Sequence, residues 1–290
     1  ILLFEIPTGV VADTLSRRKS IIIGVFLLGL GTLFFALIPS FPVIILSQVI
    51  WGLGYTFTSG ALEAWISDEV GEANAGAIFL KGTRVSQYGG LVAIPASVLL
   101  AQGQLTTPIY VSVMIFWLLG LYLILFMPET GFQPVARGDR SRLQQMTDTL
   151  RSGGRMLRLR PALISILFIG LFFGLYSEGY DRLWEARILD QFTFPDIPGL
   201  QMITWFGIID MVSQLLTILA VSPIEKRADT NKLPTLIRWL TILSTALVLS
   251  LLVFALAGSL WLAVAAVLAI GGLRAVIWPL SVYRTFPSVE

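Results

Sequence analysis

The stretch that decides the fold is Glu5-Ile-Pro-Thr-Gly-Val-Val-Ala-Asp-Thr-Leu-Ser-Arg-Arg-Lys19, a short charged connection between two strongly apolar runs. It places Asp13 just before three consecutive cations, Arg17, Arg18 and Lys19. A connection this short between helices of membrane-spanning length has to lie at one face of the bilayer. Lys and Arg in short loops mark the cytoplasmic face. The sequence therefore predicts an all-α polytopic membrane protein with this stretch in the cytoplasm.

The composition is that of a chain solvated largely by lipid. Apolar residues make up 56% of the 290 residues, charged residues only 13%, and the mean hydropathy is +0.82. A soluble domain carries about a quarter charged residues. The net charge is only +2, and the basic residues lie between apolar spans, which indicates a topology signal and not a nucleic-acid surface.

The absence of Cys and His excludes several functions. Disulfide frameworks, Cys/His zinc sites, haem-ligating His and Ser-His-Asp or Cys-His catalysis cannot be built within this chain. No Gly-x-x-x-x-Gly-Lys-Ser/Thr loop is present, so ATP is not expected to drive the protein. We expect no enzyme and no cofactor or metal, and any proton relay must use Asp, Glu, Lys, Arg or Tyr.

Apolar runs of about twenty residues, the length that crosses a bilayer core, follow one another along the chain. Residues 1–12 are predicted to be the last turns of a helix. Eight full spans are then predicted, at 20–38, 43–66, 76–101, 108–127, 161–184, 199–222, 233–257 and 259–282. The basic stretch 129–160 carries seven Arg, and it is either an amphipathic helix at the inner surface or a flexible linker.

Two short internal matches indicate that the chain contains two related halves. Gly60–Ile66 aligns with Gly271–Ile277, and Ala12-Asp-Thr14 recurs as Ala228-Asp-Thr230. With a basic stretch between them, the matches favour two helical bundles. The predicted division is an N-terminal bundle at 1–128, a cytoplasmic connector at 129–160 and a C-terminal bundle at 161–290.

The charged stretch also carries a spaced motif: Gly9, three residues, Asp13, and then Arg17-Arg18-Lys19 after Ser16. It resembles the Gly-x-x-x-Asp-x-x-Gly-Arg-Arg/Lys loop between the second and third helices of major facilitator superfamily transporters, with Ser16 at the second Gly. Three further segments are similar to bacterial drug-exporter-like members, namely Glu5–Gly9, Ser59–Ile66 and Ser177–Trp184.

The resemblance implies a twelve-helix fold in two bundles, of which this chain holds the end of helix 2 through helix 10 and is truncated at both ends. It implies transport by alternating access and a place in the bacterial inner membrane. It also implies that Asp13, with Arg17 and Arg18, belongs to a charge network that holds the cytoplasmic side closed, and that Gly9 allows close helix approach. For Arg18 and Lys19, a positive-inside anchor is the better interpretation.

Ionisable side chains at membrane depth are costly unless they are paired or hydrated, so each is a candidate functional residue. Glu63 shares one predicted helix face with three small or polar residues, Gly52, Thr56 and Ser59. An interfacial ion pair with Arg84 is the alternative for Glu63.

Arg274 occupies the matching place in the second half, where it either binds an anionic substrate group, pairs with a carboxylate, or extends to the interface. Asp210 lies near the middle of span 199–222, on a polar face with Ser213, Gln214 and Thr217. It is a candidate proton carrier, with a structural hydrogen bond as the alternative. A further charge cluster, predicted at the outer end of 161–184 as a gate or a solvated helix end, comprises Glu178, Asp181 and Arg182.

These features together predict a secondary active transporter that exports a small organic compound in exchange for protons, with the proton gradient as its energy source. Uptake by proton symport is the alternative, because Tyr88–Pro95 does not reproduce the Gly-x-x-x-Gly-Pro motif of the family's antiporters. A non-transporting sensor or scaffold is the alternative from another class. The expected partners are a small-molecule substrate and the lipid bilayer, without nucleic acid, and a monomer is expected.

Overall fold

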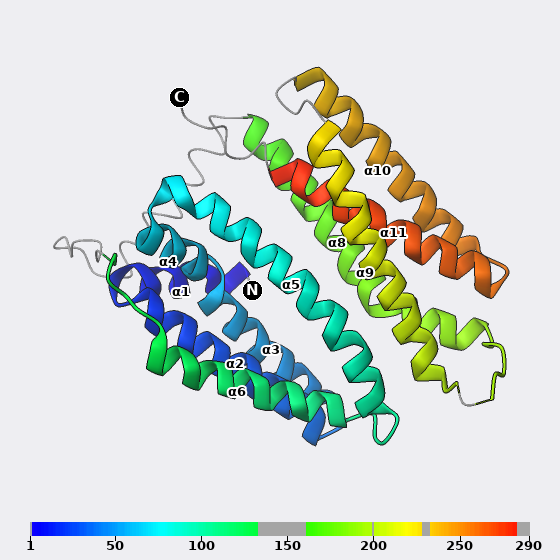
Figure 1. The fold of residues 1–290 in the computed structure, drawn as a ribbon, viewed down its shortest axis with the longest axis horizontal. Helices are drawn as coiled ribbons and strands as arrows, with labels where there is room; N and C mark the ends of the chain where they lie inside the picture. Colours follow the sequence, from blue (N-terminus) through cyan, green and yellow to red (C-terminus); the bar gives the residue numbers. More distant parts are fainter. Residues whose placement is uncertain (1, 133–160, 199, 228–232, 283–290) are drawn as a thin grey trace. The chain divides into compact units, whose positions relative to one another are not determined.

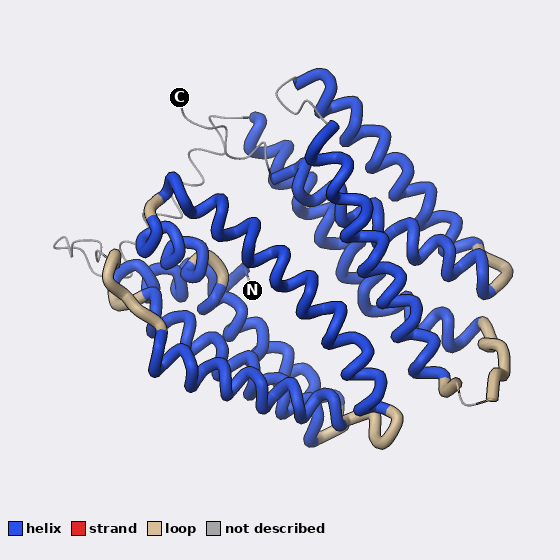
Figure 2. The backbone as a smooth tube through the Cα atoms, in the orientation of Figure 1, coloured by secondary structure: helices blue, strands red, loops and turns tan. Residues whose placement is uncertain are grey.

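The computed structural model describes residues 2–132, 161–198, 200–227 and 233–282. Nearly all of this described chain is helical, and it contains no strand (Figure 2). Its helices are α1 (Leu2–Thr14), α2 (Arg17–Leu37), α3 (Phe41–Thr58), α4 (Ala61–Val70), α5 (Glu72–Ala101), α6 (Thr107–Phe126), α8 (Pro161–Gln191), α9 (Met202–Arg227), α10 (Leu233–Leu256) and α11 (Leu260–Val282). The predicted all-α polytopic fold is confirmed.

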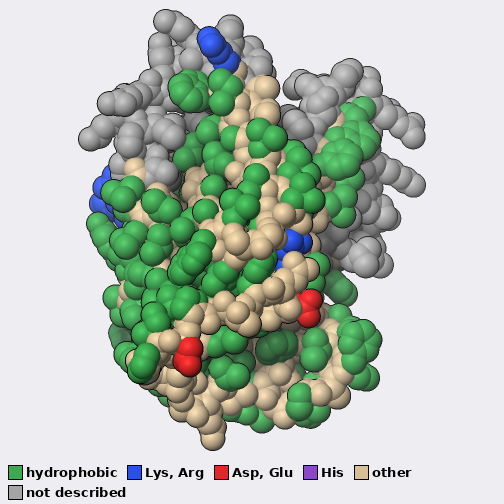
Figure 3. Space-filling model, turned by 90° about the vertical axis from the view of Figure 1, so that its right-hand side faces the viewer, with side chains coloured by type: hydrophobic (Ala, Val, Ile, Leu, Met, Phe, Trp, Pro, Cys, Tyr) green, Lys and Arg blue, Asp and Glu red, His purple; other side chains and the backbone are tan. Residues whose placement is uncertain are grey.

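Six stretches of the described helices are long and apolar enough to cross a membrane. They are Arg17–Leu37, Phe41–Val70, Thr107–Phe126, Met202–Leu219, Arg238–Leu256 and Leu260–Ile277. Figure 3 shows one face of the molecule, on which hydrophobic side chains cover much of the surface and charged side chains are few. Such a surface is suited to lipid and not to water, so the chain is an integral membrane protein. The predicted spans 76–101 and 161–184 form α5 and α8, which are helices but are not among these six.

The chain divides into two compact units. Unit 1 comprises Ile1–Arg84 and Gly103–Gly170, and unit 2 comprises Val85–Gln102 and Leu171–Glu290. Helix α5 therefore contributes its first part to unit 1 and its second part to unit 2. The division at 128 and 160 stays a prediction, and residues 133–160 of the expected connector lie outside the described residues.

In unit 1, α2 packs against both α3 and α6 (Figure 1). Glycines allow the contact between α2 and α3 to be close. A Cβ atom on Gly54 would lie 2.8 Å from the backbone oxygen of Gly24 and 2.8 Å from the backbone nitrogen of Leu28. Small residues let helix backbones approach in this way inside a membrane, where van der Waals packing drives association.

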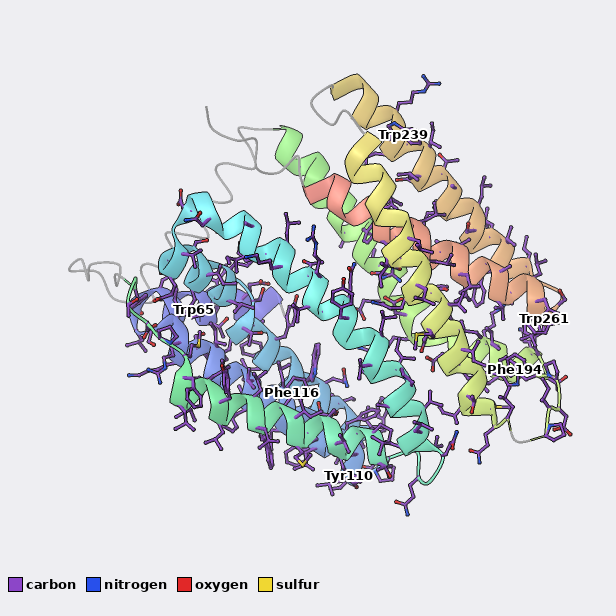
Figure 4. The ribbon with its side chains drawn as sticks, in the orientation of Figure 1. Trp65, Tyr110, Phe116, Phe194, Trp239 and Trp261 are labelled. Atoms are coloured by element: carbon purple, nitrogen blue, oxygen red, sulfur yellow. The ribbon has the colours of Figure 1, made fainter. Side chains whose placement is uncertain are left out.

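In unit 2, α11 packs against both α9 and α10 (Figure 1). Its core contains the fully buried Ile188 and Ile270 and a set of partly buried aromatic side chains. Phe194 and Trp261, which lie at one end of this unit, both contact Trp205, and Trp239 lies at the other end (Figure 4). Aromatic rings near the ends of membrane-spanning helices are typical of the membrane–water interface.

The predicted span 43–66 is not one continuous helix. Helix α3 ends at Thr58 and α4 begins at Ala61, with Gly60 between them at φ 69°. The predicted face that joined Gly52, Thr56 and Ser59 to Glu63 is therefore interrupted, and that part of the prediction is wrong. A Gly within an apolar run does not by itself announce such a break, because Gly also occurs at close helix contacts.

The break frees backbone carbonyls of α3, and two hydroxyl groups donate hydrogen bonds to them. The amide of Ala61 donates to Ser59 O at 2.7 Å, and not to the carbonyl four residues earlier. Ser20 Oγ donates to Phe57 O at 2.8 Å, and Thr8 Oγ1 donates to Thr56 O at 3.0 Å. Because an unpaired backbone group at membrane depth is costly, these hydroxyls stabilise the interruption.

Helix α8 extends beyond the predicted end of its span. It runs to Gln191, seven residues past the predicted end at 184. Tyr180, Trp184 and Ile188 recur every fourth residue and belong to the core of unit 2. This apolar face continues the helix despite the charged residues between its members.

Candidate functional site

The charged stretch of the sequence forms a compact helix-to-helix connection. Helix α1 ends at Thr14 and α2 begins at Arg17, so only Leu15 and Ser16 connect them. Ser16 is the N-cap of α2, because its Oγ accepts a hydrogen bond from the Lys19 amide at 3.0 Å. A hydroxyl at this position is useful where a glycine would leave the amide without that partner.

The carboxylate of Glu129 lies at the N-terminus of α2. It accepts hydrogen bonds from Ser16 Oγ at 2.7 Å and from the Arg18 amide at 2.9 Å. The first amides of a helix have no partner within the helix, and a negative charge there is stabilised by the helix dipole. Glu129 thus ties the segment after α6 to the start of α2.

Arg17 forms ion pairs with carboxylates from two elements. Its Nη1 contacts Asp68 Oδ2 of α4, and its Nη2 lies 4.0 Å from Asp13 Oδ1. The Arg17 side chain is only 17% exposed and that of Asp68 25%, whereas that of Asp13 is 54% exposed. The structure thus brings together the predicted Asp13 and Arg17, and it adds Asp68 as the closer partner of Arg17.

Glu69, next to Asp68, binds the segment that follows α6. It accepts hydrogen bonds from Thr130 Oγ1 at 2.6 Å and from the Gly131 amide at 2.9 Å. A Cβ atom on Gly131 would lie 2.1 Å from Asp68 O, so the close approach requires glycine. We call Asp13, Ser16, Arg17, Asp68, Glu69 and Glu129 the charged end of unit 1.

Two neighbours complete the charged end. Trp65 lies beside it on α4 and donates from Nε1 to Pro128 O at 2.8 Å (Figure 4). Arg18 donates from Nη2 to Ile124 O at 2.5 Å, near the C-terminus of α6, where a cation is favoured by the helix dipole. A Cβ atom on Gly9 would meet no described atom within 4 Å, so the close helix approach expected there is absent from the described part of the chain.

Glu63 lies in the first turn of α4, immediately after the break at Gly60. Its side chain is exposed, and within the described ranges it has neither a hydrogen bond nor an ion pair, so the alternative of a pair with Arg84 is not observed there. A carboxylate in the first turn of a helix is stabilised by the helix dipole. The break thus gives Glu63 a local environment that a continuous helix would not.

Asp210 lies on α9, eight residues after the start and nine before the end of the apolar span Met202–Leu219. Its side chain is exposed and has no hydrogen bond or ion pair among the residues that the structure describes. Two other residues of the polar face predicted for α9 contact neighbouring helices. Ser213 faces Gly271 of α11, and Gln214 donates from Nε2 to Gln87 O at 3.4 Å.

The predicted cluster on α8 separates into two ion pairs of different character. Asp181 forms a bidentate pair with Arg274 of α11, with Nη1–Oδ1 at 2.5 Å and Nη2–Oδ2 at 2.8 Å. Glu178 and Arg182 pair with each other at 3.7 Å and are strongly exposed, at 76% and 65%. Of the three functions that we considered for Arg274, the structure shows the pair with a carboxylate.

A cavity of about 350 Å³ adjoins this pair. It is lined by Phe173, Gly271, Arg274 and Ala275, all in unit 2. The guanidinium carbon of Arg274 also lies 6.0 Å from the ring centroid of Tyr176. The arrangement combines a cation, an aromatic wall and free volume. Among the described residues no group of three or more Asp and Glu side chains is placed to hold a metal ion.

Sequence comparisons agree with the fold. The family model described as Major Facilitator Superfamily matches residues 1–286. A curated relative, the "Uncharacterized MFS-type transporter YxaM" of Bacillus subtilis (strain 168), is 26% identical over 192 residues, which are 65% of this chain and 47% of that protein. The chain therefore spans about half the length of the curated relative that it matches.

Proposed function

Because the chain belongs to the major facilitator superfamily, we propose that the whole protein is a secondary active transporter that works by alternating access. The observation that carries the proposal is the charged end of unit 1, where Arg17 is paired with Asp13 and Asp68. A largely buried cation between two carboxylates has two discrete arrangements available, paired or separated, which suits a conformational latch.

The predicted function of the charged end is to hold the cytoplasmic side closed in one state. Supporting this, Glu129 and Glu69 attach the segment after α6 to α2 and α4, so the start of the expected connector moves with the latch. Motion of one bundle would thereby be passed to the chain that joins it to the other bundle. Location in the bacterial inner membrane, with the charged end in the cytoplasm, is part of this proposal.

For the transported compound, we propose export of a small organic compound in exchange for protons. Asp210 and Glu63 are the candidate proton carriers, because each is a carboxylate in an apolar span without a partner in the described chain. An ionised group at such a depth is costly unless it faces water or is neutralised by a proton. A carboxylate that faces water or that takes up a proton is suited to carrying protons across the membrane.

Uptake by proton symport is the second candidate, and the pair of Asp181 and Arg274 is the observation that favours it. A substrate anion that binds Arg274 releases the carboxylate of Asp181. That carboxylate can then accept a proton that travels with the substrate. A sensor or scaffold that transports nothing has no comparable supporting feature in the described chain.

Proton flux in proteoliposomes tests the proposal. The full-length protein is reconstituted, and internal pH is followed while lipophilic cations and small organic acids are added. We expect substrate-dependent proton flux that Asp210→Asn or Glu63→Gln abolishes and that Asp190→Asn leaves intact, because Asp190 is an exposed carboxylate near the end of α8. Flux that is unchanged in both variants would remove the proton-carrier assignment, and no flux with any compound would refute transport.

A further inference from the structure

The pair of Asp181 and Arg274 lies more than two turns from the nearest end of each helix. At about 1.5 Å per residue, Arg274 is about 21 Å along α11 from its start at Leu260, and Asp181 is about 15 Å from the end of α8 at Gln191. The hydrocarbon core of a bilayer is about 30 Å thick. α8 and α11 meet here within unit 2 (Figure 1).

The pair is not covered by protein as an ordinary buried ion pair is. The Asp181 side chain is 49% exposed and that of Arg274 is 27% exposed, and Arg274 lines the cavity directly. A pair that serves only to neutralise two charges needs no free volume beside it. Here the guanidinium has its carboxylate on one side and an open cavity on another.

The cavity has the volume for a small aromatic molecule, and its lining includes one aromatic side chain, Phe173. Its volume of about 350 Å³ is at the lower end of ligand sites, which measure about 300–1,000 Å³. Phe173 and Tyr176 pack edge to face with ring centroids 4.9 Å apart, and these rings stand on the α8 side of the site. On the α11 side, Gly271 and Ala275 leave the volume open because their side chains are small.

Two hydroxyl groups near the pair lack partners. The Oη atoms of Tyr176 and Tyr180 are buried and make no hydrogen bond within the described residues. Buried hydroxyls are nearly always hydrogen-bonded, so these two donors are available to an additional acceptor. A tyrosine hydroxyl donates to an anion as readily as to water. The hydroxyls of Tyr176 and Tyr180 and the guanidinium of Arg274 are all hydrogen-bond donors. In the structure, the carboxylate of Asp181 is the acceptor bound to the guanidinium.

From this juxtaposition we propose that Arg274 binds the carboxylate of a small aromatic acid, and that Asp181 competes with the acid for the same guanidinium. The proposal rests on the proposed function, since it names the substrate class. Arg presents a planar fork that accepts a carboxylate in two parallel hydrogen bonds, and Asp181 already occupies it in that way. A ligand carboxylate replaces one such pair by another of the same geometry, and the Asp181 carboxylate that it displaces is 49% exposed and can take up a proton.

Binding of matched probes to the purified full-length protein tests the proposal independently of transport. The probes are benzoate, its neutral analogue benzamide and its cationic analogue benzylammonium, and titration calorimetry measures their dissociation constants. We expect benzoate to bind with a dissociation constant of about 1 mM and the two analogues to bind at least tenfold more weakly. Equal binding of benzoate and benzamide would overturn the proposal, because the cation would then have no part in recognition.

Variants separate recognition from structural support. Asp181→Asn should tighten benzoate binding about tenfold, because the competing carboxylate is gone and more of the protein is competent to bind. Arg274→Gln should abolish binding. Arg274→Lys, which keeps the charge but loses the fork, should weaken binding about tenfold and covers the case in which the Gln variant does not fold. Glu178→Gln, in the exposed pair three residues from Asp181, is the matched control and should change binding less than twofold.

The outcomes distinguish this proposal from the proposed function. Benzoate binding that survives Arg274→Gln, or that Asp181→Asn does not tighten, overturns the assignment of the site. No benzoate binding by the wild type and the Asp181→Asn variant also overturns it. If benzoate binds as expected while proteoliposomes show no flux, the proposed transport function is refuted and the assignment of the binding site is retained. If only lipophilic cations produce flux, the transport function is retained and the assignment of an anion-binding site is refuted.

Discussion

Replacing Glu129 tests how firmly the segment after α6 is attached to α2. Glu129→Ala removes the acceptor for Ser16 Oγ and for the Arg18 amide, and it leaves the first turn of α2 without its negative charge. Two charge-assisted hydrogen bonds contribute about 1.5 kcal/mol each, so we expect a loss of about 3 kcal/mol in the free energy of unfolding. Glu129→Gln keeps an acceptor and loses mainly the interaction with the helix dipole, about 1 kcal/mol.

The assay is reversible unfolding of the full-length protein in mixed micelles, followed by far-ultraviolet circular dichroism. Glu72→Ala is the matched control, because Glu72 is an exposed carboxylate in the first turn of α5 and should change stability by less than about 0.5 kcal/mol. A double variant with Glu69→Ala should lose more than Glu129→Ala, since Glu69 holds the next two residues of the same segment. If Glu129→Ala unfolds with the same free energy as the Glu72→Ala control, the attachment contributes nothing and the reasoning is refuted.

Three further variants test local packing and capping. Ser16→Ala should cost about 1 kcal/mol, because the N-cap of α2 is lost, and a stability equal to wild type would show that the hydroxyl does not cap the helix. Gly54→Ala should cost about 1–3 kcal/mol, because the added Cβ meets backbone atoms of α2 that cannot rotate away. Gly89→Ala is the control for Gly54→Ala, because no described atom lies within 4 Å of a Cβ at Gly89. We expect it to raise the free energy of unfolding by up to about 1 kcal/mol through helix propensity. Equal effects of the two substitutions would contradict the close packing of α2 against α3. Gly131→Ala should speed hydrogen exchange at the Gly131 amide, since the Cβ displaces the segment from Glu69; unchanged protection would contradict that contact.

The helices could be predicted from the sequence because a membrane-spanning helix requires about twenty consecutive, mostly apolar residues, and such a run can be recognised locally. Every run of about twenty apolar residues became helix, and the charged stretch at Asp13 and Arg17 became a short connection between two helices. An apolar run also predicted α8, but the charges after Asp181 concealed its continuation, since the apolar face that extends the helix recurs only every fourth residue.

The partners of the charged residues could not be predicted in the same way. Glu129 reaches Arg18 across 111 positions of sequence, and Asp181 reaches Arg274 across 93. Such pairs depend on which helices are neighbours, and no local spacing carries that information. A usable signal did exist for Asp68, because Asp68-Glu69 is an acidic pair in the sequence whereas Arg17 begins a basic run, and opposite charges at one membrane face tend to pair.

The break at Gly60 was missed for a different reason. Hydropathy averages over a whole span, so a span with an interruption of two residues still scores as one helix. The hydroxyls of Thr8 and Ser20 that compensate the freed carbonyls lie on other helices. Their positions became meaningful only once the packing of α1 and α2 against α3 was known.

Proton-driven accumulation tests the central claim most directly. Proteoliposomes containing the full-length protein are given a pH gradient, and a radiolabelled substrate identified in the flux assay is present at equal concentration on both sides. Coupled transport predicts that the substrate accumulates against its own gradient until the pH gradient decays, on the acidic side for proton exchange and on the alkaline side for symport. Substrate concentrations that stay equal on the two sides, in vesicles that hold the pH gradient, would contradict a proton-coupled secondary transporter.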